Sequence, residues 1–170
     1  MGGAVPDTQS RLPFDRWERT IEELSDVPFD RGERALECAR AQKLIEELLE
    51  AYAVASEHER ERLRALYAAH PAFFHTAERV LWRTADPLAT ARLHLLFYSL
   101  LDGGPDEREV WYLALPAIVE NALKGEPPVS RRDLARVLRE VASVSNRTSR
   151  SKTGTPMAEI FERIAGELLR

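Results

Sequence analysis

The sequence contains one cysteine, Cys38, so an intrachain disulfide and a thiolate-rich zinc site are both excluded. It also has no long apolar run. The longest uncharged one, Leu93 to Leu101, is about half as long as a membrane-spanning helix requires. The N-terminal residues carry no basic stretch followed by an apolar one, as a secretory signal would. We therefore expect a cytoplasmic protein without a membrane segment.

The common catalytic motifs are missing as well. There is no Gly-x-Ser-x-Gly, P-loop, Rossmann glycine fingerprint or HExxH. None of the four histidines follows a glutamate at the three-residue spacing that di-iron helical bundles use. We therefore predict a protein that is not an enzyme and that holds neither a metal nor a cofactor. A weaker alternative is a small-ligand or metal pocket near His75, His94 and Trp111.

The spacing of apolar residues predicts the fold class. Apolar side chains recur three and four residues apart, and no stretch alternates as a strand would. We predict an all-α protein, a single domain of seven or eight helices packed as an irregular antiparallel bundle. Within it we expect a disordered N-terminus at 1–11, an amphipathic helix at 12–26, and a helical domain at 27–170 with a basic polar loop at 143–155.

The predicted helix at 12–26 has a narrow apolar seam, formed by Phe14, Trp17, Ile21 and Leu24. A seam of this width is nearer to a coiled-coil pattern than to a core helix. The pattern leaves two possibilities open, because the helix could dock on its own domain or on another chain.

Several residues mark where the other helices begin and end. Asp86 before Pro87 and Ser130 before an apolar stripe are expected helix starts. The stretch from 93 to 101 has almost no polar face, so we expect a helix that is covered on most sides. Pro116 removes a backbone donor, which predicts a kink or break there.

Charge is distributed unevenly along the chain. Residues 1–128 hold 15 Lys/Arg and 23 Asp/Glu, a net charge of −8, whereas residues 129–170 hold 9 and 5, a net charge of +4. Such asymmetry is typical of an anion-binding end, or of two surfaces that face each other in the fold. Arginine far outnumbers lysine, and Asn and Gln are scarce, which fits a bacterial source with a high-GC genome or heat adaptation.

The basic stretch between Val129 and Pro156 is the candidate site. Its cations are predicted contacts for a partner or for phosphate groups: Arg131, Arg132, Arg136, Arg139, Arg147, Arg150 and Lys152. The leading hypothesis is a protein–protein interaction module, such as an adaptor, regulator or immunity-type partner, and a homo-oligomer is also open. The alternative is backbone-directed nucleic-acid binding through residues 131–152, as in an accessory subunit of a nucleoprotein complex. A third possibility is a solvated helix face whose arginines pair with the acidic helices.

Overall fold

The computed structural model describes residues 12–26, 35–78, 86–100, 105–145 and 154–170, with the backbone alone described over 105–113. These described residues form eight α-helices and no strand, which confirms the all-α prediction. Residues 1–11, predicted to be disordered, lie outside them. The helices are α1 (Phe14–Leu24), α2 (Ala35–Val54), α3 (Glu57–Ala69), α4 (Pro71–Ala77), α5 (Pro87–Ser99), α6 (Pro105–Leu123), α7 (Arg131–Val144) and α8 (Met157–Leu168).

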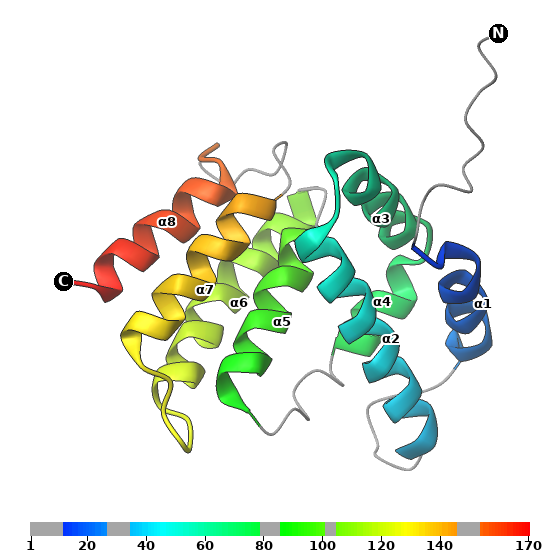
Figure 1. Ribbon diagram of the computed structural model, residues 1–170, viewed down its shortest axis with the longest axis horizontal. Coiled ribbons are helices and arrows are strands. Elements are labelled where there is room, and N and C mark those ends of the chain that lie inside the picture. The colour runs from blue at the N-terminus through cyan, green and yellow to red at the C-terminus, as the bar shows by residue number, and fades with distance from the viewer. Residues whose placement is uncertain (1–11, 27–34, 79–85, 101–104, 146–153) are drawn as a thin grey trace, which may run out of the picture.

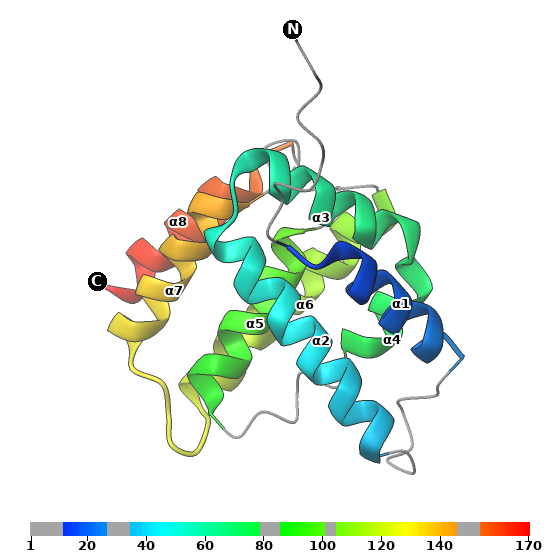
Figure 2. The same cartoon turned by 45° about the vertical axis from the view of Figure 1, so that its right-hand side comes forward.

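The eight described helices lie in two groups that share α2. Helices α5 to α8 lie side by side in one group, and α1, α3 and α4 gather on the other side (Figures 1 and 2). Helix α2 packs against members of both groups, including α1, α3, α5 and α7. It is therefore the element that joins the two groups into one core.

Helices α2, α5 and α7 each contribute seven or eight buried residues to the core. On α2, an apolar stripe is buried from Cys38 to Tyr52, and Ile45 and Leu49 have no solvent exposure. On α5, all residues from Leu93 to Ser99 are buried, which confirms that this helix is covered on most sides. Among the described residues, no helix combines the length and the apolar character needed to cross a bilayer.

Helix α1 docks on its own domain, which is the first of the two possibilities that its narrow seam left open. Trp17, Ile21 and Leu24 are almost completely buried, and α1 packs against α2. The Phe14 ring lies edge-on to the Trp17 ring, with centroids 5.5 Å apart. The Arg62 guanidinium of α3 lies over the Phe14 ring, 4.1 Å from its centroid. The seam is narrow because one face of a short helix covers the edge of the core.

The predicted helix starts at Asp86 and Ser130 are confirmed. Two other predictions, at Pro116 and at the end of α7, differ from the structure. The Ser130 hydroxyl accepts a hydrogen bond from the Asp133 amide at 3.1 Å, and Asp86 accepts one from the Leu88 amide at 3.0 Å. Helix α6, by contrast, continues through Pro116 without a break, because the buried residues around it hold the helix against its neighbours. Helix α7 runs to Val144, so the polar loop begins after the predicted position 143.

Candidate functional site

Three of the predicted contact residues line one hollow on the surface. Arg132, Arg136 and Arg139 lie at four- and three-residue spacing, so they share the outward face of α7. Together with Ala135 and Leu169 they line a hollow of about 470 Å³, which we call the arginine groove. Leu169 is the residue after α8, and 47% of its surface is exposed. The groove therefore combines three cations with an exposed apolar side chain.

The groove exists because α7 and α8 pack against each other in opposite directions. The Arg131 Nε atom, at the start of α7, donates to the Leu168 carbonyl at the end of α8 at 3.0 Å. Farther along α7, Arg139 lies 3.8 Å from the Glu162 carboxylate in the middle of α8. Buried residues of both helices, including Leu138 and Phe161, hold this pair together. Arg131 is thus tied to the C-terminus of α8, where a cation is favourable, and does not line the groove.

The three groove arginines differ in how much of their charge is neutralised. Arg136 pairs with Asp133 at 2.9 Å, but its side chain remains 73% exposed. Arg139 pairs loosely with Glu162, and both of these side chains are more than half exposed. Arg132 is exposed and forms no ion pair with any described residue. Because exposed pairs are weak, a partner's carboxylates can compete for these guanidinium groups.

The sequence predicted part of this site and missed part of it. Arg147, Arg150 and Lys152 lie outside the described residues, so their position relative to the groove stays a prediction. Leu169 was missed because it falls beyond the buried stripe of α8. The signal that could have identified it is a second leucine directly after Leu168, at a position that does not belong to the buried stripe.

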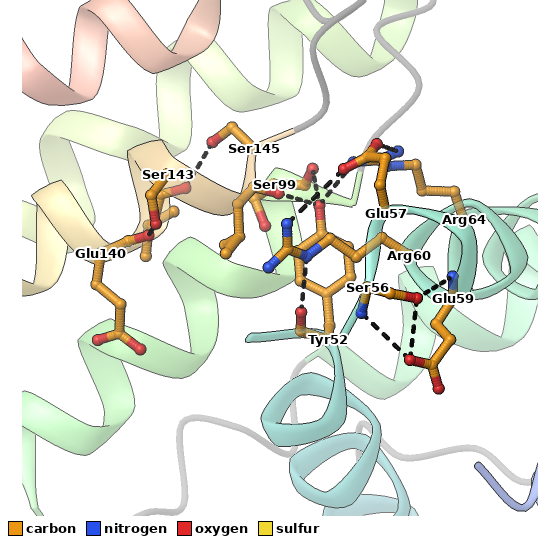
Figure 3. Close-up of polar contacts among 12 residues, drawn as sticks. Tyr52, Ser56, Glu57, Glu59, Arg60, Arg64, Ser99, Glu140, Ser143 and Ser145 are labelled. Carbon is orange, nitrogen blue, oxygen red and sulfur yellow. Dashed lines mark hydrogen bonds and ion pairs between the residues drawn. The ribbon is translucent and has the colours of Figure 1, made fainter. Parts of the chain in front are cut away.

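A buried polar cluster around Tyr52 fixes the far end of α7 (Figure 3). The Tyr52 hydroxyl donates to the Val144 carbonyl at the C-terminus of α7 and lies 3.4 Å from the Ser99 carbonyl of α5. It accepts a hydrogen bond from Arg64 of α3 at 3.2 Å, and Glu57 pairs with the same guanidinium at 3.0 Å. One side chain of α2 therefore ties three other helices together.

A second polar link holds the C-terminal half of α7. The Arg92 guanidinium of α5 pairs with Glu140 of α7 at 2.7 Å and also with Glu50 of α2. Its side chain is 22% exposed, so this bridge is less screened by solvent than the pairs at the groove. Together with the Tyr52 hydrogen bond, this bridge ties the C-terminal half of α7 to α2 and α5.

The two histidines of the predicted small-ligand pocket differ in their exposure to solvent. His75 is exposed on α4, whereas His94 is completely buried on α5, with its Nδ1 atom 3.6 Å from a Glu78 carboxylate oxygen. Glu78 also accepts a hydrogen bond from the Tyr98 hydroxyl. Among the described residues, no three His, Cys, Asp or Glu side chains are placed to hold a metal ion. The Trp111 side chain lies outside the described part of the structure.

A second surface hollow, of about 190 Å³, lies between α5 and the end of α6. It is lined by small apolar and uncharged polar residues, among them Pro87, Thr90, Asn121 and Gly125. Neither this hollow nor the arginine groove is lined by His75 or His94. Because it presents no charged side chain, this second hollow offers fewer groups for specific recognition than the arginine groove.

The buried tyrosines predict a loss of stability at alkaline pH. Burial raises the pKa of Tyr52 and of Tyr98, and the Glu78 carboxylate raises that of Tyr98 further. A raised pKa stabilises the fold below about pH 10, the unfolded value, and this stabilisation is lost as pH rises towards the folded pKa. Tyr98→Phe should therefore make the decline in unfolding free energy above pH ~10 shallower by about 1.4 kcal/mol per pH unit. Urea titrations of both proteins from neutral to alkaline pH measure this, and equal slopes would contradict it.

Comparison with known proteins found no matching family model, no matching curated protein and no matching solved structure. Function is therefore inferred from the residues of the site.

Proposed function

We propose that the protein is a non-enzymatic helical module that binds another protein through the arginine groove, as a cytoplasmic adaptor, regulator or immunity-type partner. The observation that carries this proposal is the convergence of Arg132, Arg136 and Arg139 on one hollow beside the exposed Leu169. Arginine is enriched at protein interfaces because its planar guanidinium can both form paired hydrogen bonds and pack against apolar surface.

The apolar part of the groove favours a protein partner over nucleic acid. Ala135 and Leu169 add apolar lining, which a sugar–phosphate backbone does not need. A protein segment that carries both carboxylates and apolar side chains matches this combination better.

Loss of the three guanidinium groups should weaken partner binding without unfolding the protein. In a variant with Arg132→Gln, Arg136→Gln and Arg139→Gln, we expect about a tenfold loss of affinity, since three exposed ion pairs at about 0.5 kcal/mol each sum to about 1.5 kcal/mol. Glutamine keeps the helix propensity of α7. Calorimetric titration with the partner and thermal unfolding of the free variant separate the two effects. Unchanged affinity would contradict the proposed site.

Site-specific photo-crosslinking identifies the partner. A photoreactive residue is placed at Leu169, and a control is placed at Leu36, which is 74% exposed on α2. We expect a discrete protein adduct from position 169 alone, and its loss when the three arginines are replaced by glutamine. A nuclease-sensitive adduct at position 169 would instead support the nucleic-acid alternative. Equal adducts at both positions, or none, would overturn the proposed function.

A further inference from the structure

We propose that the segment occupying the arginine groove is an acidic amphipathic α-helix of the partner protein, an inference that rests on the protein-binding function proposed above. This helix is expected to carry carboxylates three and four residues apart, with at least one apolar side chain between them. The carboxylates face the groove arginines, and the apolar side chain packs on the exposed Leu169.

The arrangement of the cations matches a helix that lies along α7. Arg132 and Arg136 are separated by about 6 Å along the helix axis, and Arg136 and Arg139 by about 4.5 Å, at 1.5 Å per residue. A second helix running beside α7 places side chains at the same intervals when they lie four and three residues apart. The groove lies between α7 and the end of α8, which are neighbours in Figure 1, so an added helix would lie over both of them.

Gly166 leaves open space on the face of α8 that also carries Leu169. It lies four residues after Glu162 and three before Leu169, so these three residues share one face of α8. Its φ is not positive, and a Cβ atom built there meets no atom within 4 Å. Nothing in the described protein therefore requires glycine here, although glycine weakens a helix relative to alanine. A helix docked in the groove would approach α8 closely at Gly166, because a residue without a side chain allows two helix backbones to come near each other.

The charges around the groove define the charge that the partner helix must carry. Arg132 forms no ion pair with any described residue, and Arg136 and Arg139 are held only by exposed acids. Three carboxylates from an incoming helix would pair with Arg132 and compete with Asp133 and Glu162 for the other two arginines. A basic or uncharged helix would leave the three guanidinium groups next to one another without added compensation.

A selection of peptides on the intact protein tests the proposal. The full-length chain is immobilised, and a phage-displayed library of random peptides is selected against it. The enriched peptides are synthesised, titrated by calorimetry, and examined for helix formation by circular dichroism with and without the protein. We expect Asp or Glu at three- and four-residue spacing around an apolar residue, and helix formation on binding. We also expect about a tenfold loss of affinity when the three groove arginines are replaced by glutamine.

Two variants sharpen the result. Arg19→Gln with Arg163→Gln removes exposed charges outside the groove, so affinity should change little. Gly166→Ala should raise the midpoint of thermal unfolding by about 1–2 °C, because alanine favours the helix. It should also weaken peptide binding by about fivefold or more, because the added methyl overpacks the contact. Opposite signs for stability and binding are expected only if another backbone approaches Gly166.

Three outcomes would overturn the proposal. Enriched peptides that require the arginines but are extended or lack acidic residues would refute the acidic helix and leave the protein-binding function standing. Peptides whose affinity ignores the three arginines would refute both the helix and the groove as the binding site, as would a selection without enrichment. A Gly166→Ala protein that binds as tightly as wild type would refute the close approach at α8.

Discussion

Replacing Trp17 with alanine should lower the free energy of unfolding by about 3–5 kcal/mol, the range for a fully buried aromatic side chain cut back to a methyl. Only 1% of Trp17 is exposed, and Ile21 and Leu24 on the same face of α1 are equally buried. The substitution would leave a cavity between α1 and α2 that the short helix cannot close. Urea unfolding monitored by circular dichroism gives the change, because helix loss is observed directly.

The matched control on the same helix is Arg19→Ala, which removes an exposed side chain. Its effect should lie within about 0.5 kcal/mol, as is usual for surface positions. A loss of less than about 1 kcal/mol for Trp17→Ala would mean that α1 contributes little to the fold. Its apolar seam would then be available to another chain, and the docking described for α1 would be wrong.

Replacing Tyr52 with phenylalanine should lower the free energy of unfolding by about 2–3 kcal/mol, although it removes only one oxygen atom. Ring packing is retained, so the loss comes from the groups that the hydroxyl satisfies. These groups are the Val144 and Ser99 carbonyls and the Arg64 guanidinium. A buried polar group left without its partner costs about 1–3 kcal/mol, and more when it is charged.

Ser143→Ala is the matched control for Tyr52→Phe. It removes a hydroxyl that bonds the Glu140 carbonyl within the same helix and is exposed to solvent. Water replaces that hydrogen bond, so the change should be about 0.5 kcal/mol or less. Equal small effects for the two variants would show that Tyr52 does not tie α2 to α3, α5 and α7.

Helix positions were predictable because the physical signals are local. The apolar stripes of α2 and α7 and the caps at Asp86 and Ser130 depend only on residues within a few positions. Pro116 was harder, because a proline disfavours a helix locally while burial of its neighbours favours it. The extent of α7 past position 143 also depends on tertiary contact, since the Val144 carbonyl is bonded by Tyr52 from α2.

The candidate site was predictable only in part. The spacing of Arg132, Arg136 and Arg139 already predicts one shared helix face. The sequence does not show that α8 runs antiparallel beside them, and this packing brings Leu169 to the groove. The same packing removes Arg131 from the site by tying it to the Leu168 carbonyl. Such outcomes depend on how two helices meet, and the sequence pattern of either helix alone does not contain that information.

Hydrogen exchange of the full-length chain, with and without the acidic peptide of highest affinity from the selection, tests the groove as the binding site most directly. We predict slower amide exchange on binding over residues 131–139 and 162–169, and unchanged exchange in α1 to α4. The variant with three glutamines, at the same peptide concentration, should show weaker protection in the same segments. Protection centred on α1 to α4, or protection at the groove that is unaffected by the three substitutions, would contradict the account.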